Sequence, residues 1–156
     1  MIFSPITSKQ DSAAALIYSA YIEAFPEHER RSKEQYDALF DHPKVEVCAI
    51  IKDDQTIGYV VIWKLNGFAY LEHFEVFPEF RNYKYGSSII QNLILLYPQL
   101  VLEAEPTSLD EMAARRIAFY ERNGFTIIDK DYIQPSYGPG KSSMNLYVLA
   151  TWIPED

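Results

Sequence analysis

The chain has 156 residues, of which 48% are hydrophobic and 15% aromatic, and its formal net charge is −8. This length suits a single domain over residues 1–156 with a sizeable core, and the composition excludes a disordered chain. The negative charge argues against general nucleic-acid binding, which needs a basic surface. An acidic surface favours cationic partners such as amines, or it only confers solubility.

The cysteine content and the apolar runs exclude further classes of protein. Cys48 is the only cysteine, so the sequence excludes an internal disulfide and a cysteine-cluster metal site, and we expect no metal. It lies in an apolar run, which indicates a buried, unreactive thiol. The N-terminus lacks a signal-peptide pattern, and no apolar run approaches the ~20 residues that span a bilayer. We therefore expect a cytoplasmic protein with no membrane partner.

The N-terminal part of the chain is predicted to form one short strand and two helices. The strand lies near Ile2–Pro5, and the apolar residues that follow recur at helical spacing until Pro26, which ends the first helix. Ser32 and Gln35 form a capping-box pattern that opens the second helix. The residues at helical spacing are Ala14, Ile17, Tyr18, Tyr21 and Phe25.

Three strands are predicted to follow as an antiparallel meander. Two pairs of turn residues separate them, Asp53-Asp54 and Asn66-Gly67. The second pair is typical of a type I′ hairpin turn. The three strands span residues 45–52, 57–65 and 68–77.

The second half of the chain alternates helices and strands. Apolar residues at helical spacing predict a helix over residues 85–97, and a capping-box pattern over residues 108–111 opens another. The predicted strands span residues 100–105, 125–133 and 144–150. The whole pattern predicts an α+β fold, with a mixed, mostly antiparallel sheet of six to seven strands and about four helices on its two faces.

Residues 74–87 join an apolar strand to an amphipathic helix through a short turn that carries Arg81 and Lys84. The first-turn amides of a helix lack intrahelical partners, and the helix dipole is positive there. A phosphate or pyrophosphate fits such an end, with basic side chains closing over it. The alternative is an ordinary strand-to-helix turn with two solvated cations.

This stretch resembles the acetyl-CoA-binding signature of the GNAT superfamily of N-acetyltransferases. The family pattern is Arg or Gln, two residues, Gly, one residue, then Gly or Ala. The chain matches its first and last positions and has Lys84 in place of the first glycine; it reads Arg81-Asn82-Tyr83-Lys84-Tyr85-Gly86. A lysine has a Cβ and a long stem that a glycine lacks.

A second stretch, residues 115–125, resembles the later motif of the same family. In that motif a helix ends in Tyr, three residues, then Gly-Phe, which here are Tyr120 and Gly124-Phe125. Gly124 can adopt the left-handed conformation that stops a helix. The resemblance covers roughly residues 44–150, and it implies the GNAT acyl-CoA N-acyltransferase fold with acetyl-CoA as co-substrate.

The resemblance implies a role for each matching residue. Backbone groups of Phe74 and Val76 would pair with the pantetheine arm as if it were another strand. The residues that would contact the cofactor are Phe74, Val76, Arg81, Asn82, Tyr83, Lys84, Tyr85, Gly86 and Ser87. Tyr120 would protonate the sulfur of CoA, whereas a tyrosine at helical spacing is otherwise only a core residue. Ala113 stands where the family often has asparagine.

The general base is open between several groups. Glu72 is the first candidate, because many family members have an acid near that strand position, Glu103 is the second and His73 the third. A chain of water molecules could also serve. Burial within a sheet tends to raise the pKa of a carboxylate, as a base needs. Glu72 and Glu75 lie three residues apart on one strand, so we expect them to face opposite sides of the sheet.

Contacts to the acceptor are expected from the first two helices, from the loop that connects them and from the last loop, residues 134–141. Glu27 or Glu29 could attract an ammonium group, and Arg30 could bind a carboxylate, although the same residues also suit a solvated charged loop. Phe25 is a further candidate contact, and Tyr137 could close the pocket from the far side.

The resemblance implies direct acetyl transfer from acetyl-CoA to a primary amine of a small molecule, peptide or protein. The transfer needs a base for the amine and a proton donor for the sulfur. Two alternatives stay open: a non-catalytic acyl-CoA-binding or protein-interaction module with a GNAT fold, and transfer of a longer acyl group. We expect a monomer or a homodimer.

Overall fold

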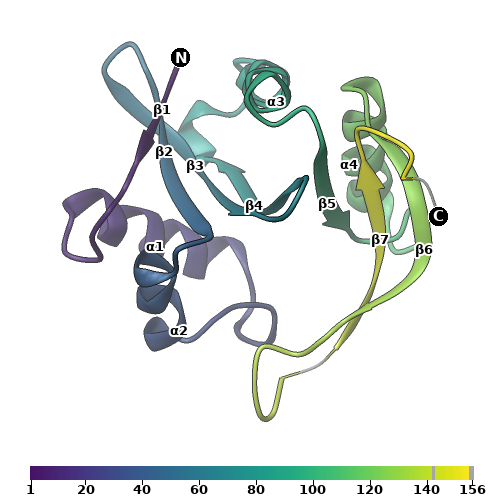
Figure 1. Ribbon diagram of the computed structural model, residues 1–156, viewed down its shortest axis with the longest axis horizontal. Coiled ribbons are helices and arrows are strands. Elements are labelled where there is room, and N and C mark those ends of the chain that lie inside the picture. The colour runs from purple at the N-terminus through teal and green to yellow at the C-terminus, as the bar shows by residue number, and fades with distance from the viewer. Residues whose placement is uncertain (142, 155–156) are drawn as a thin grey trace.

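The computed structural model describes residues 1–141 and 143–154 (Figure 1). Within them, one seven-stranded sheet has the order β1-β2-β3-β4-β5-β7-β6, and only its β4–β5 pair is parallel. The predicted mixed, mostly antiparallel sheet is therefore confirmed. The strands are β1 (Ile2–Pro5), β2 (Val45–Lys52), β3 (Gln55–Lys64), β4 (Ala69–Val76), β5 (Leu100–Ala104), β6 (Thr126–Gln134) and β7 (Met144–Ala150).

Four α-helices in the described part of the chain cover the two faces of the sheet, as predicted. The helices are α1 (Ser12–Ala24), α2 (Lys33–Ala38), α3 (Tyr85–Leu96) and α4 (Glu111–Arg122). Ile17 of α1 and Tyr36 of α2 share one buried cluster with Tyr59 of β3. Ile89 of α3 and Ile117 of α4 belong to a second cluster on the other face. Figure 1 shows α1 and α2 together on one side and α3 and α4 on the other.

Strands β4 and β5 run side by side for only a short distance. Their pairing is Ala69 with Leu100, Tyr70 with Val101 and Leu71 with Leu102. Strand β4 then continues to Val76, and among residues 1–141 and 143–154 only β3 pairs with this part of it. The backbone edge of residues 72–76 that faces β5 is consequently free of strand partners, which opens the sheet at its centre.

Two local predictions were wrong. The first concerns the type I′ turn, which requires positive φ angles at its two central residues. Asp53 and Asp54 have such angles, of 51° and 62°. In the predicted type I′ turn only Gly67 has a positive φ, of 85°, so Asn66-Gly67 forms another turn. The cap of α4 is Asp110, whose side chain accepts from the amide of Ala113 at 2.7 Å, rather than the predicted capping box.

Side chains cap the starts of α1 and α2. The predicted capping box of α2 is confirmed, because Ser32 Oγ accepts from the Gln35 amide at 3.2 Å and the Gln35 side chain accepts from the Ser32 amide. Asp11 caps α1 through the amide of Ala13 at 2.9 Å. Over the described residues, no helix combines the length and the apolar character that crossing a membrane demands.

Candidate active site

A cleft of about 830 Å³ fills the space where β4 and β5 separate. Its β4 wall includes Glu72 to Val76, and its β5 wall includes Glu103 to Glu105. Helices α1 and α4 contribute the other sides, and Tyr137 of the β6–β7 loop closes one end. Because β4 and β5 pair over only three residues on each strand, this cleft lies at the centre of the sheet.

Tyr120 lies on the α4 wall of this cleft. Its ring packs against Phe119 at 5.2 Å and Phe125 at 5.5 Å between centroids, and the residue is 9% exposed. Burial raises the pKa of Tyr120 to about 12, and the charge of Arg116 opposes the rise. The phenol is therefore protonated at neutral pH and can donate a hydrogen bond or a proton.

The end of α4 is tied to the start of α3 by one buried amide. Asn123 donates from Nδ2 to Ser87 Oγ at 3.3 Å, and its Oδ1 accepts from Gln91 Nε2 at 3.1 Å. Gly86 allows the close approach, because a Cβ there would lie 3.3 Å from the ring of Phe119. These contacts set the distance between Tyr120 and the first turn of α3, and the sequence motifs did not predict them.

The first turn of α3 has no side-chain cap, unlike α1, α2 and α4. Its N-cap is Lys84, with φ 62° and ψ 25°, and Asn82 also has a positive φ, of 75°. Lys84 thus adopts the left-handed conformation that a glycine enters without cost. The residue that departs from the family pattern is therefore in a strained conformation, at a cost of roughly 1 kcal/mol.

Arg81 turns toward β4 rather than toward the α3 amides. Its Nε donates to the Val76 carbonyl at 2.9 Å, and its Nη2 lies 3.5 Å from Glu75 Oε1. Of the nine residues predicted to contact the cofactor, Phe74, Val76 and Arg81 line the cleft. The others form the turn beyond it and the first residues of α3, where the rings of Tyr83 and Tyr85 stack at 5.6 Å.

The prediction that Glu72 and Glu75 face opposite sides of the sheet was wrong. The β3–β4 register passes from Leu71–Ile62 to His73–Val61, which leaves Glu72 as an extra residue in a β-bulge. A bulge shifts the alternation of side chains by one residue. Both carboxylates consequently lie on the α1–α2 side, where Glu72 meets Arg31 and Glu75 lies opposite Tyr59.

Glu72 is held by three groups. Its Oε2 lies 2.6 Å from Arg31 Nη2 and accepts from the Tyr137 hydroxyl at 3.4 Å, while its Oε1 accepts from Trp63 Nε1 at 3.1 Å. Burial acts to raise the pKa of Glu72, but the opposing contributions of His73, Arg31 and Trp63 outweigh it and hold the pKa below its usual range. The prediction that burial raises the pKa is therefore wrong for Glu72.

Glu103 lies across the cleft from Glu72, and within the described part of the chain it forms no ion pair with a guanidinium group. Its Oε2 accepts from Gln134 Nε2 at 2.9 Å. Burial raises the pKa of Glu103, and hydrogen bonds with Tyr70 and Gln134 oppose that rise only in part. The raised pKa that a base needs therefore belongs to Glu103 rather than to Glu72.

His73 lines the cleft but is enclosed by aromatic rings. Tyr21 and Phe25 lie 5.1 and 5.0 Å from its ring centroid. Burial lowers the pKa of His73 to about 4, against an opposing contribution from Glu72. The imidazole is therefore neutral at pH 7, and its buried Nε2 has no hydrogen-bond partner among the described residues.

The residues predicted to contact an acceptor divide between two places. Phe25, Tyr137 and Glu29 line the cleft. Glu27 lies in a short 3-10 helix outside the lining, and Arg30 donates from Nη1 to the carbonyls of Ile22 and Phe25 at 3.1 and 2.9 Å. Arg30 thereby satisfies carbonyl groups at the end of α1, and its contact with a substrate carboxylate stays a prediction.

Arg31 is a residue that the motifs did not single out. Its guanidinium lies 4.9 Å from the centroid of the Tyr137 ring, and its amide donates to the Tyr21 hydroxyl at 2.6 Å. Together with the Glu72 ion pair, these contacts join α1, β4 and the β6–β7 loop at one residue. Only the charge run at residues 27–31 hinted at it. Over residues 1–141 and 143–154, no group of three or more His, Cys, Asp or Glu is arranged to hold a metal ion.

Comparisons with known proteins identify the family of this chain. The profile of the acetyltransferase (GNAT) family matches residues 12–125. A search of curated proteins gives no match. A GNAT-family protein from Bacteroides thetaiotaomicron has 34% sequence identity and a TM-score of 0.92, over 100% of this chain and 89% of its own.

Two more distant structures share the fold and contain the cofactor or its product. A GNAT acetyltransferase from Elizabethkingia anophelis, solved with acetyl-CoA bound, has 19% identity and a TM-score of 0.63, over 96% of this chain and 95% of its own. A Bacillus subtilis acetyltransferase in complex with CoA has 14% identity and a TM-score of 0.64, over 96% and 97%. With the family profile and the 34% identical relative, the chain belongs to the GNAT family of acetyltransferases.

Proposed function

We propose that the protein transfers an acetyl group from acetyl-CoA to a primary amine by direct attack, within the cleft between β4 and β5. The observation that carries this proposal is the pair of titratable groups on the walls of one cleft. Tyr120, a protonated phenol, lies on the α4 wall, and Glu103, a carboxylate with a raised pKa, lies on the β5 wall. A proton donor and a proton acceptor are the two groups that the reaction needs.

The free edge of β4 and the start of α3 fit the two ends of the cofactor. Backbone groups of residues 72–76 have no partner on the β5 side, so an extended pantetheine arm can pair with them as an added strand. The uncapped amides of Tyr85, Gly86 and Ser87 suit the pyrophosphate. When bound, acetyl-CoA supplies the activated acetyl group, and these residues hold and orient it.

Glu103 and Tyr120 then carry out the two proton transfers. Glu103 takes a proton from the acceptor ammonium, because only the neutral amine is a nucleophile. Tyr120 donates a proton or a hydrogen bond to the sulfur as the carbon–sulfur bond breaks. Glu72 is a weaker base, since its ion pair with Arg31 stabilises the ionised carboxylate. We assign it to positioning Tyr137 and Arg31.

One observation favours a second candidate, a non-catalytic module that binds acyl-CoA. Lys84 places a Cβ and an amine-bearing stem at the turn where the family has glycine, next to the proposed pyrophosphate site. This could weaken the binding of the nucleotide without changing the fold.

Two measurements on the purified protein separate these functions. Isothermal titration with acetyl-CoA measures binding, and thiol release over a panel of primary amines measures transfer. We expect binding and amine-dependent release. Binding without release for any amine would support the module, and the absence of both would contradict the proposed cofactor site.

A further inference from the structure

Asn123 is a buried polar residue to which neither sequence motif gives a role. It forms the C-cap of α4 and is 6% exposed. Its Nδ2 donates to the Phe119 carbonyl at 2.9 Å and to Ser87 Oγ at 3.3 Å. Its Oδ1 accepts from Gln91 Nε2 at 3.1 Å. One side chain at the end of α4 thus forms hydrogen bonds with the first two turns of α3.

The chemistry of these partners fixes the direction of the hydrogen bond to Ser87. A carbonyl oxygen only accepts, so the amide nitrogen of Asn123, rather than its oxygen, faces the Phe119 carbonyl. That nitrogen is only a donor, so Ser87 Oγ accepts its second hydrogen. The bond from Gln91 to the amide oxygen agrees with this orientation. The hydrogen of the Ser87 hydroxyl is therefore left for another acceptor.

The Ser87 hydroxyl lies at the start of α3. Ser87 is the third residue of this helix and is exposed, and side chains on a helix lean toward its N-terminus. Among residues 1–141 and 143–154, no acceptor takes the hydrogen of this hydroxyl. The same end of α3 has no side-chain cap, so its first amides also lack an acceptor. The hydroxyl and the amides are thus donors at one end of one helix.

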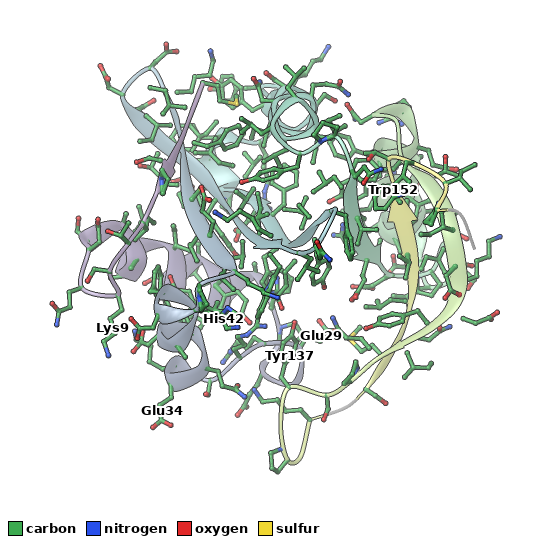
Figure 2. All side chains as sticks on the ribbon, viewed as in Figure 1. Lys9, Glu29, Glu34, His42, Tyr137 and Trp152 are labelled. Carbon is green, nitrogen blue, oxygen red and sulfur yellow. The ribbon has the colours of Figure 1, made fainter. Side chains whose placement is uncertain are left out.

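These donors are separate from the acceptor end of the cleft. The residues that line the cleft include neither Ser87 nor Asn123. In Figure 2, Glu29 and Tyr137 of the cleft wall lie on the opposite side of the molecule from α3. We therefore expect a change at Ser87 to act on the nucleotide end of a bound cofactor and to leave the acceptor amine unaffected.

We propose that Asn123 is a positioning residue for the cofactor. It keeps the Ser87 hydroxyl turned toward the start of α3, where this hydroxyl donates a charge-assisted hydrogen bond to the diphosphate of acetyl-CoA. The inference rests on the proposed function, which assigns the diphosphate to the first amides of α3. Without Asn123, the hydroxyl can turn to the Tyr83 carbonyl four residues earlier, as serine side chains in helices do. Asn123 itself touches neither cofactor nor substrate and acts through Ser87.

Equilibrium binding of CoA to matched variants, measured by isothermal titration, tests the inference. Ser87→Ala should raise the Kd about tenfold, the effect of one hydrogen bond to a charged group. Ser88→Ala, the same change at the neighbouring exposed serine, is the control and should change the Kd less than about twofold. Asn123→Ala should raise the Kd about fivefold alone but less than about twofold when combined with Ser87→Ala, because its effect passes through that hydroxyl.

A second variant decides the case in which Asn123→Ala does not fold. Asn123→Asp keeps the size of the side chain, but its carboxylate only accepts, so it takes up the hydroxyl hydrogen of Ser87. This variant should weaken the binding of CoA at least as much as Ser87→Ala does. An Asn123→Asp protein that binds CoA with the wild-type affinity overturns the inference.

The remaining outcomes separate the inference from the proposed function. Equal affinities of Ser87→Ala and Ser88→Ala for CoA overturn the inference and leave the proposed function intact. The same holds for a loss in Asn123→Ala that is equal in both backgrounds, since Asn123 then acts on the structure alone. A wild-type protein that does not bind CoA contradicts both. The predicted non-additive losses without thiol release for any amine support the role of Asn123 and contradict the transferase.

Discussion

Arg31 Nη2 lies 2.6 Å from Glu72 Oε2, so the carboxylate first expected to act as base is instead neutralised by a buried guanidinium. The two side chains are 14% and 6% exposed, and their separation is that of a charge-assisted hydrogen bond. Proton transfer to Glu72 would leave the Arg31 charge buried without its partner. Because of this ion pair, we propose Glu103 on β5 as the base rather than Glu72 on β4.

Substitutions of the two carboxylates should have different consequences. Glu103→Gln should lower kcat/KM by about 10²–10³, the usual contribution of a general base, with little change in the free energy of unfolding. Glu72→Gln should instead reduce that free energy by about 3 kcal/mol, because it leaves Arg31 buried and unpaired. Urea denaturation and steady-state kinetics on both variants measure the two effects. A larger kinetic loss for Glu72→Gln than for Glu103→Gln would return the role of base to Glu72.

Removing the phenol of Tyr120 should slow the chemical step. Tyr120→Phe keeps the ring packed between Phe119 and Phe125, so we expect kcat to fall by about a hundredfold with the KM for acetyl-CoA nearly unchanged. With its pKa near 12, Tyr120 should not limit the rate at any pH below about 10. Tyr97→Phe, at a tyrosine outside the cleft, is the matched control. Unchanged turnover in Tyr120→Phe would exclude the phenol as the proton donor.

Lys84→Gly should stabilise the protein. The left-handed N-cap of α3 strains any residue with a Cβ, and glycine removes the strain at some entropic cost, for a net gain of about 0.5–1 kcal/mol. Lys84→Ala removes the amine but keeps the Cβ, so it separates the conformational effect from the loss of charge. Thermal unfolding of the three proteins measures the difference. An equal gain for both variants would show that charge, rather than backbone conformation, sets the cost.

The stability of the protein should decrease as the pH falls below about 6.5. Burial lowers the pKa of His73 to about 4 in the folded chain, while in the unfolded chain it is near 6.5. Between these values the unfolded state binds more protons, so the free energy of unfolding rises with pH across this window, by about 3 kcal/mol in all. Urea denaturation from pH 4 to pH 7 measures it. His73→Gln should flatten the dependence of the free energy of unfolding on pH, and a substitution of the exposed His42 by Gln is the control. A wild-type profile that is flat between pH 4 and 6.5 would contradict the buried neutral imidazole.

Elements with a strong repeating pattern could be predicted from the sequence. The strand over residues 45–52 and the last strand over residues 144–150 agree with their predicted bounds, and α3 differs by one residue at its end. The choice between two neighbouring candidates for one helix cap was harder to predict. Ser108 and Asp110 are both good N-cap residues, and the choice of Asp110 depends on where the chain leaves β5.

Part of the site depends on contacts that no local pattern encodes. The bulge at Glu72 arises from the pairing of β3 with β4, so counting alternate residues along β4 gave the wrong face for it. The partner of Glu72 comes from a charged loop 41 residues earlier in the sequence, where Arg30 and Arg31 look equivalent. In the fold, Arg30 binds carbonyls of α1 and only Arg31 reaches the cleft wall.

A crystal structure with acetyl-CoA bound tests the central claim most directly. The account predicts that the diphosphate lies on the amides of Tyr85, Gly86 and Ser87. It also predicts that pantetheine pairs with the free edge of β4, and that the thioester sulfur lies within about 3.5 Å of the Tyr120 oxygen. A cofactor that binds elsewhere, or a phosphate niche filled by the side chain of Lys84, would contradict it.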